Sequence, residues 1–233
     1  MSRITYKFAN SPVVFVAPHG HPSDDLNTDL IAKFAAIDMD ANYIINTGFK
    51  RGLDPNPSQD IADCNNRIHC KTAEVEDEFL LPYIKICKRA LKYFGKCFVV
   101  WVHGVSDNIR NLNVSTKNLD MIIGYGLGRP DSLTCYEGII HKFLYEIRRD
   151  KLSCFVGQAG GKYSGFDNKN MNQFWRKYDF EEKIQSFQLE IIKDLRSDKT
   201  ISELTANCIT DAMKASMDYP NFRLPTFMSI NYI

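Results

Sequence analysis

Short apolar segments alternate along this chain with amphipathic ones, and this alternation constrains the fold more than any other feature of the sequence. Each apolar segment has the length of a strand and is rich in β-branched or aromatic residues. The alternation predicts an α/β fold with a mostly parallel sheet that is covered on both faces. The predicted strands cover 12–17, 41–46, 97–102, 120–124, 152–156 and 187–192, and the predicted helices cover 27–34, 73–94, 132–149 and 204–217.

The composition narrows the class of protein. The 233 residues show no internal repeat, no low-complexity tract and no clear linker, so we predict a single domain over residues 1–233. The 29 basic and 28 acidic side chains give a net charge of +1, which argues against a nucleic-acid partner or an anionic membrane. No apolar run approaches the ~20 residues of a membrane span.

The seven cysteines occur at irregular spacing and without a CxxC pair. This usage is typical of reduced, buried thiols rather than of a disulfide framework or a structural zinc site. Cys64, His69 and Cys70 form the one Cys/His cluster, at a spacing that is unusual for a metal site. Since the N-terminus also lacks the apolar core of a secretion signal, we predict a cytoplasmic protein.

Two histidines stand at corresponding places in the pattern. His19 comes just after the strand predicted at 12–17, and His103 just after the strand at 97–102. Ligands of open α/β sheets bind at the carboxyl ends of the strands, so both histidines are expected at one edge of the sheet. Glycine follows each of them, which allows a sharp turn and leaves space at the site. A lone histidine after a strand is usually structural, but two in the same context indicate a shared ligand.

A catalytic zinc ion takes three protein ligands and keeps one position open. The segment after His19 offers His21, Asp24 and Asp25, and an acidic residue would complete a site of two histidines and one carboxylate. The two aspartates also suit a solvated helix N-terminus, where the helix dipole favours carboxylates. Both interpretations hold together if each aspartate has one of the two roles.

A glutamate lies within the apolar segment 187–192, where its burial costs free energy unless it has a partner or a role. Strand alternation places Gln188 and Glu190 on one face, and Leu189 and Ile191 on the other. Hydrolysis at a zinc site needs a group that takes a proton from the attacking water and passes it to the leaving nitrogen. Glu190 is the candidate for this group, although a salt-bridged glutamate at a solvated edge explains the residue equally well.

Several short motifs follow the order found in N-formylglutamate amidohydrolases, which the chain resembles from about residue 12 to residue 196. The chain is also similar to bacteriophage poly-γ-glutamate hydrolases, whose Gln-Leu-Glu strand is especially close. Both families belong to the zinc carboxypeptidase-like group, so the resemblance implies a three-layer α/β/α sandwich of the phosphorylase/hydrolase type, with a mostly parallel mixed sheet. The motifs are VVFVAPHG at 13–20, Asn66-Arg67, VHG at 102–104, Asp120-x3-Gly124, Gly160-Gly161 and FQLEI at 187–191 followed by Leu195.

The resemblance also implies a set of site residues. Zinc would be bound by His19, Asp24 and His103, with Glu190 as the catalytic acid and base. Asp24 aligns with the acidic ligand of the phage hydrolases, where glutamate is usual. Because aspartate has a shorter reach than glutamate, Asp25 remains an alternative ligand.

The pair Asn66-Arg67 matches the carboxypeptidase pair that binds a substrate carboxylate. A fixed guanidinium holds a carboxylate through two hydrogen bonds and so positions the neighbouring amide. Arg129 and Lys162 are further cations for a second carboxylate or for the oxyanion, and surface charge on glycine-rich loops explains them as well. Cys64 stands where the formylglutamate enzymes carry aspartate, two residues before Asn66, which weakens the case for formylglutamate itself as substrate.

The sequence therefore predicts a zinc-dependent hydrolase of amide bonds next to a carboxylate. Its substrate would be small and acidic or a peptide, such as an N-acyl amino acid or a γ-glutamyl amide. The alternative is a catalytically inactive protein that binds a small molecule or peptide on the same fold, which the joint presence of His19, His103 and Glu190 disfavours. Nucleotide binding has little support, because the chain has no Walker-type motif and no Rossmann-type motif after its first strand. The sequence predicts no oligomeric state.

Overall fold

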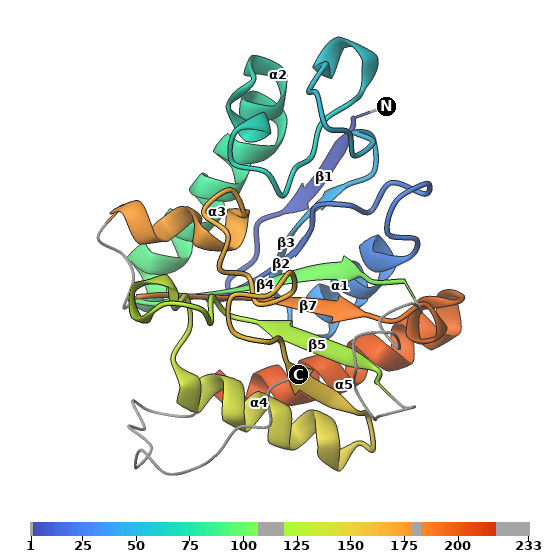
Figure 1. Ribbon diagram of the computed structural model, residues 1–233, viewed down its shortest axis with the longest axis vertical. Coiled ribbons are helices and arrows are strands. Elements are labelled where there is room, and N and C mark those ends of the chain that lie inside the picture. The colour runs from blue at the N-terminus through green and yellow to red at the C-terminus, as the bar shows by residue number, and fades with distance from the viewer. Residues whose placement is uncertain (1, 107–118, 179–182, 218–233) are drawn as a thin grey trace.

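The computed structural model describes residues 2–106, 119–178 and 183–217. At its centre lies a seven-stranded mixed sheet with the strand order β1-β3-β2-β4-β7-β5-β6 (Figure 1). The strands are β1 (Ile4–Lys7), β2 (Val13–Ala17), β3 (Asn42–Asn46), β4 (Cys97–Gly104), β5 (Met121–Gly124), β6 (Cys154–Val156) and β7 (Ile184–Ile191).

The central strands of the sheet are parallel. β2 pairs in parallel with β3 and β4, β4 pairs in parallel with β7, and β5 pairs in parallel with β6. Only the pairs β1–β3 and β5–β7 are antiparallel among the described strands. The prediction of a mostly parallel mixed sheet is therefore confirmed.

Helices cover both faces of the sheet, because the strands bury apolar side chains on both sides. Along β2, Val13, Phe15 and Ala17 pack in one cluster, and Val14 and Val16 pack in another. The helices are α1 (Thr28–Asp38), α2 (Ala73–Val75), α3 (Leu81–Phe94), α4 (Glu137–Arg149) and α5 (Lys199–Met217).

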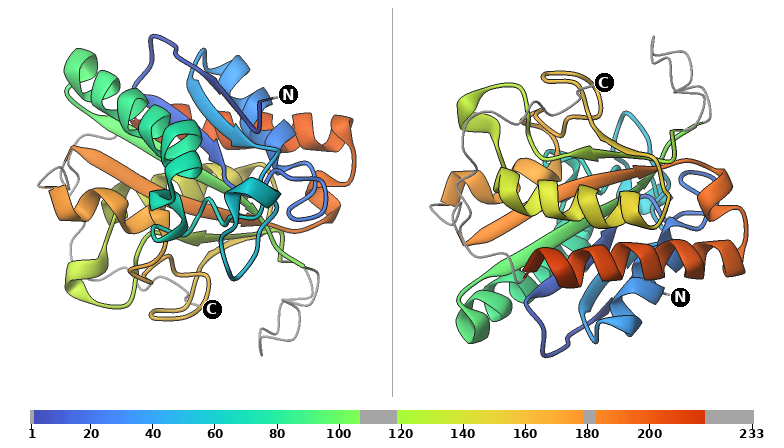
Figure 2. Two further views of the ribbon diagram at one scale, coloured as in Figure 1. Left: turned by 90° about the horizontal axis from the view of Figure 1, so that it is seen from above. Right: turned by 90° about the horizontal axis from the view of Figure 1, so that it is seen from below.

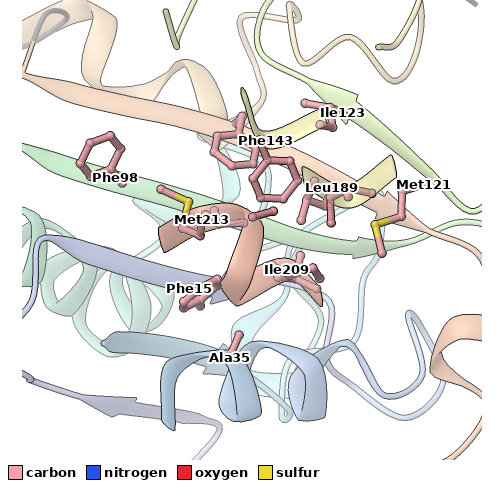
Figure 3. Packing of buried hydrophobic residues seen from close by; sticks show 14 of the residues in the cluster. Phe15, Ala35, Phe98, Met121, Ile123, Phe143, Leu189, Ile209 and Met213 are labelled. Carbon is pink, nitrogen blue, oxygen red and sulfur yellow. The ribbon is translucent and has the colours of Figure 1, made fainter. Parts of the chain in front are cut away.

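The first cluster lies under α1, α4 and α5, and the second lies under α3 and a 3-10 segment, η6 (Met171–Tyr178). Figure 2 shows α3 on one side of the sheet, with α4 and α5 on the other. Figure 3 shows side chains from several layers meeting in the first cluster: Phe15 and Leu189 of the sheet lie near Phe143 of α4 and Ile209 of α5. These two clusters on opposite faces confirm the three-layer α/β/α sandwich.

Several elements differ from the sequence prediction. α1 and α5 are longer than predicted, β6 is shorter, and the helix predicted at 73–94 is divided into α2, a π-helical segment and α3. Four further differences concern the sheet and the chain beside it. β1 was not predicted, because only Ile4 of its four residues is buried. β4 continues through His103 and Gly104, and β7 begins at Ile184, because both strands pair with each other over their full length. The fourth, helix α4, begins at Glu137 rather than at residue 132. The chain before it is held extended against β7, where Ser186 N donates to Thr134 O at 2.8 Å.

No helix in the described residues is long and apolar enough to cross a membrane. The described strands all belong to one sheet. The assignment of residues 1–233 to a single domain stays a prediction.

Candidate metal centre

Three strand ends bring the predicted site residues to one place. His103 lies on β4 directly opposite Glu190 on β7, and His19 lies just beyond the end of β2. Their neighbours Val102, Leu189 and Ile191 pack under α1, α4 and α5, so His103 and Glu190 point to the other face of the sheet. The prediction that these residues meet at one edge of the sheet agrees with this arrangement.

The donor atoms of two histidines and one aspartate converge. The Nδ1 atoms of His19 and His103 are 3.3 Å apart, and Oδ2 of Asp25 lies 3.2 Å from the first and 3.9 Å from the second. All three side chains are buried. Donor atoms bound to one tetrahedral zinc at its usual bond lengths are about 3.3 Å from one another. The spacing and the two-histidine, one-carboxylate chemistry therefore fit a zinc ion.

The structure groups Asp25, rather than the preferred Asp24, with the two histidines. The loop from His19 to Asp25 is closed by a hydrogen bond from Asp25 N to His19 O at 3.0 Å, and this turn brings the Asp25 side chain to His19. Gly104 N donates to Asp25 Oδ2 at 3.0 Å and fixes the carboxylate. Asp24 points elsewhere and accepts a hydrogen bond of 2.7 Å from Arg51 N. The geometry therefore favours the alternative ligand, Asp25, over Asp24, and the ligand assignment stays a prediction.

His19 has a second carboxylate partner that the sequence prediction missed. Its Nε2 atom lies 2.7 Å from Oδ1 of Asp63, which also accepts a hydrogen bond from Asn65 N. The resemblance places an aspartate two residues before Asn66, where this chain has Cys64. Asp63 stands two residues before the neighbouring Asn65. This pattern, offset by one residue, is the signal in the sequence that indicates Asp63.

The cluster shifts the pKa values of its two histidines in opposite directions. Burial alone would lower the pKa of His19, but its hydrogen bonds to Asp25 and Asp63 outweigh burial and raise the pKa to about 9. Burial, together with the charge of His19, lowers the pKa of His103 to about 3. Burial works against the Asp25 charge too, yet its contacts with the histidines lower the pKa of Asp25 to about 2. At neutral pH these pKa values make His19 the charged imidazolium, between two carboxylates, and leave His103 neutral.

Glu190 is buried beside this cluster without a cation in ion-pair contact among the described residues. Gln188, on the same face of β7 as predicted, donates from Nε2 to Glu190 Oε1 at 3.1 Å. Burial and the nearby charge of Asp25 raise the pKa of Glu190 to about 8, against the smaller effects of His19, Lys162 and Arg51. The structure does not support the alternative of a salt-bridged glutamate at a solvated edge.

The structure places Arg67 and Arg129 in the wall of one pocket of about 440 Å³. Arg176, for which the sequence gives no signal, lines the same pocket, and Asp131 is the one acidic residue of the lining within the part of the chain that the structure describes. The described residues that line the pocket are Arg67, Arg129, Asp131, Ser132, Phe166, Asn168, Gln173 and Arg176.

This pocket and the metal centre share no lining residue, and a hydrogen-bonded series of residues lies between them. Asn66, next to Arg67, pairs through its backbone with Asn170. Asn170 Nδ2 donates to Gln188 Oε1 at 2.8 Å, and Gln188 in turn donates to Glu190. The side-chain oxygen of Asn66 accepts from Ile68 N, so it is engaged within its own loop.

The remaining candidates lie outside both groups. His21 contacts the Ser23 hydroxyl at 2.8 Å, and its ring is not part of the donor cluster. Lys162 is exposed and lies near enough to Glu190 to affect its pKa, but it does not line the pocket. Cys64, His69 and Cys70 are buried without forming a metal-ligand cluster in the described residues.

No protein-family model and no curated protein sequence matches the chain. Its fold is nevertheless similar to that of solved structures. An N-formylglutamate amidohydrolase from Ralstonia eutropha JMP134 superposes with a TM-score of 0.59 at 16% identity, over 94% of this chain and 100% of that one. A bacteriophage poly-γ-glutamate hydrolase gives a TM-score of 0.52 at 13% identity, over 91% and 87% of the two chains.

A metallo-carboxypeptidase from Burkholderia cenocepacia gives a TM-score of 0.52 at 12% identity, and covers 92% of this chain and 60% of its own. These neighbours match the group of enzymes that the sequence resembles. At such low identities the likeness shows the fold alone, which is one that amidohydrolases and metallo-carboxypeptidases share.

Proposed function

We propose that this protein is a zinc-dependent hydrolase that cleaves an amide bond next to a carboxylate. The observation that carries the proposal is the convergence of His19 Nδ1, His103 Nδ1 and Asp25 Oδ2 within 3.9 Å of one another, beside the buried Glu190. A protein that had lost catalysis would have no reason to keep a buried carboxylate at such a cluster, since its burial costs free energy.

His19, His103 and Asp25 would hold the metal. Once His19 has lost the proton of Nδ1, its Nε2 hydrogen would stay bound to Asp63, and the lone pair of Nδ1 would be directed at the site. Asp25 is held in turn by Gly104 N. Zinc in a site of this kind lowers the pKa of a bound water to about 7 and polarises a carbonyl group.

Glu190 is the proposed general acid and base. Its raised pKa in the metal-free protein comes from burial and from Asp25, and a bound dication would lower it again. The carboxylate would then take the proton of the attacking water and deliver it to the leaving nitrogen. Gln188 fixes one oxygen of this carboxylate, so the other oxygen remains for the proton transfer.

Arg67 and Arg129 would bind the acidic part of the substrate. Together with Arg176 they line their pocket with three guanidinium groups, and among the described residues Asp131 is the acidic member of the lining. Arg67 is kept in place by a hydrogen bond of 3.0 Å from Nη1 to Asn168 O. Guanidinium groups fixed in this way favour carboxylates, which supports a substrate that is acidic on the side of the amide that faces the pocket.

Metal content and hydrolysis of a small panel test the proposal. The purified protein should hold about one zinc per chain and hydrolyse N-acyl glutamates or poly-γ-glutamate, and chelation should abolish the activity and added zinc restore it. The alternative of an inactive binding protein requires that acidic peptides bind without turnover in zinc-loaded protein. Activity that is unaffected by complete removal of the metal would contradict the zinc mechanism.

A further inference from the structure

The guanidinium of Arg196 lies behind the metal centre and donates to three backbone carbonyls. Nη1 donates to Leu26 O at 2.8 Å, Nε to Ile191 O at 3.1 Å, and Nη2 to Val105 O at 3.2 Å. The side chain is 7% exposed, which is uncommon for an arginine. A buried guanidinium that binds three carbonyls holds the three chain segments at fixed distances.

Each of these segments carries one of the site residues. Leu26 directly follows Asp25, Ile191 directly follows Glu190, and Val105 stands two residues after His103. Arg196 thus joins the two strand ends and the turn from which the proposed site is built.

Gly104 shows how closely Arg196 approaches the site. A Cβ atom on Gly104 would lie 2.6 Å from Arg196 Cζ, so a side chain there would force the guanidinium to shift. Gly104 has no left-handed backbone conformation, and the turn expected at this glycine does not occur. The backbone N–H of Gly104 donates to Asp25 Oδ2, so the guanidinium packs against the residue that fixes the Asp25 carboxylate.

The carbonyl of Arg196 is itself held. Asn27 donates from Nδ2 to Arg196 O at 2.7 Å, and Asn27 has a left-handed backbone conformation with φ of 63° at the start of α1. The connection between Arg196 and the Asp25 turn therefore runs in both directions, from Arg196 to Leu26 O and from Asn27 to Arg196 O.

We infer that Arg196 is a positioning residue, which sets the spacing of His103, Asp25 and Glu190 without touching metal or substrate. The inference rests on the proposed function, because it concerns the same site. Its physical basis is that donors held at the spacing of the metal bind it more tightly than donors that must first be ordered. A purely structural arginine would instead contribute to folding stability and leave the affinity of the site unchanged.

Two variants and a matched control test this inference. Arg196→Met removes all three donors, and Asn27→Gly removes the return hydrogen bond while keeping a residue that tolerates the left-handed conformation. Arg148→Met is the control, since Arg148 also donates to a backbone carbonyl, from Nε and Nη2 to Cys154 O at 3.0 and 2.9 Å, but joins α4 to β6.

Two measurements are needed on each variant. The first is zinc affinity, by competition with a chelator at a temperature where the variant is folded. The second is amide hydrogen exchange at Gly104 in the metal-free protein, which reports the hydrogen bond to Asp25 without any metal or turnover. We expect both site variants to lose about 10–100-fold in zinc affinity and to exchange faster at Gly104, with no such changes in Arg148→Met.

The inference is overturned if zinc affinity and exchange at Gly104 change no more in the site variants than in the control. If Arg196→Met does not fold, Asn27→Gly decides alone. If the wild-type protein binds no zinc, the proposed function fails, and exchange at Gly104 still decides whether Arg196 orders the Asp25 carboxylate.

Discussion

The Nε2 atom of His19 lies 2.7 Å from Oδ1 of Asp63, while its Nδ1 atom faces Asp25 and His103. The imidazole therefore stands between two carboxylates, and in the metal-free protein it holds a proton with a pKa of about 9. A metal can bind Nδ1 only after this proton has left.

Zinc affinity should accordingly depend on pH. Because the pKa of His19 lies above its usual value of 6.5, the metal-free site is protonated at neutral pH and loses its proton only as the pH rises through about 9. We expect the affinity to rise by at least about tenfold per pH unit between pH 7 and 8.5, more steeply below pH 8, where zinc also displaces the proton of Glu190, and to level off above pH 9. Competition with a chelator of known pH dependence measures this slope.

Asp63→Asn provides the control for the pH dependence. The substitution removes one of the two carboxylates that stabilise the charged imidazole, so the affinity should level off at a lower pH than in the wild type. A wild-type affinity that does not change between pH 7 and 8.5 would contradict the protonated His19.

The two neighbouring aspartates allow a matched comparison. Asp25→Asn removes a proposed ligand. Its zinc affinity should therefore fall by more than the ~10–100-fold that is typical when only a residue that supports a ligand is lost. Asp24→Asn should keep its zinc, since Asp24 only accepts a hydrogen bond from Arg51 N. Zinc per chain after dialysis measures both, and loss of metal from Asp24→Asn alone would restore the original assignment.

Sequence and structure agree where a local pattern determines position. His19 and His103 were found because each stands at the end of an apolar strand, and Glu190 because it interrupts one. The choice between Asp24 and Asp25 depended on a turn in which Asp25 N bonds to His19 O, and no residue pattern in the segment specifies that turn.

The sequence does not predict contacts between residues that are far apart in the chain. Asp63 is 44 residues from His19, and Arg196 reaches carbonyls that are up to 170 residues away. Nothing in the local pattern around either residue indicates such a partner. The sequence predicts a turn at Gly104, whereas in the structure the guanidinium of Arg196 packs where a side chain at this position would lie.

Substrate recognition is tested at Arg67. Arg67→Lys keeps the charge and loses the planar pair of donors, so kcat/KM for substrates with a carboxylate next to the amide should fall by about 10–100-fold, the worth of one charged hydrogen bond. Zinc content should not change. Arg149→Lys is the control, because Arg149 pairs with Glu146 on α4, and α4 contributes no residue to the pocket. Equal turnover of a substrate and its carboxamide analogue would show that no carboxylate is recognised.

The catalytic assignment is tested at Glu190. Glu190→Gln keeps nearly the same shape and removes the group that accepts and donates the proton. Because Glu190 is buried with no cation in ion-pair contact among the described residues, its replacement by a neutral amide should not lower the melting temperature. The variant should fold, keep its zinc and lose about 10²–10⁴-fold in kcat.

Glu146→Gln is the matched control for Glu190→Gln, since Glu146 is also a buried glutamate but lies on α4 in ion pairs with Lys142 and Arg149. Breaking those pairs should lower the melting temperature of Glu146→Gln and leave its kcat near that of the wild type. The two variants thus separate the two roles of a buried glutamate, one by turnover and the other by stability. Melting temperature, bound zinc and kcat on both purified proteins decide between them. If Glu190→Gln loses stability while its turnover survives, Glu190 is a structural residue and the hydrolysis requires another base.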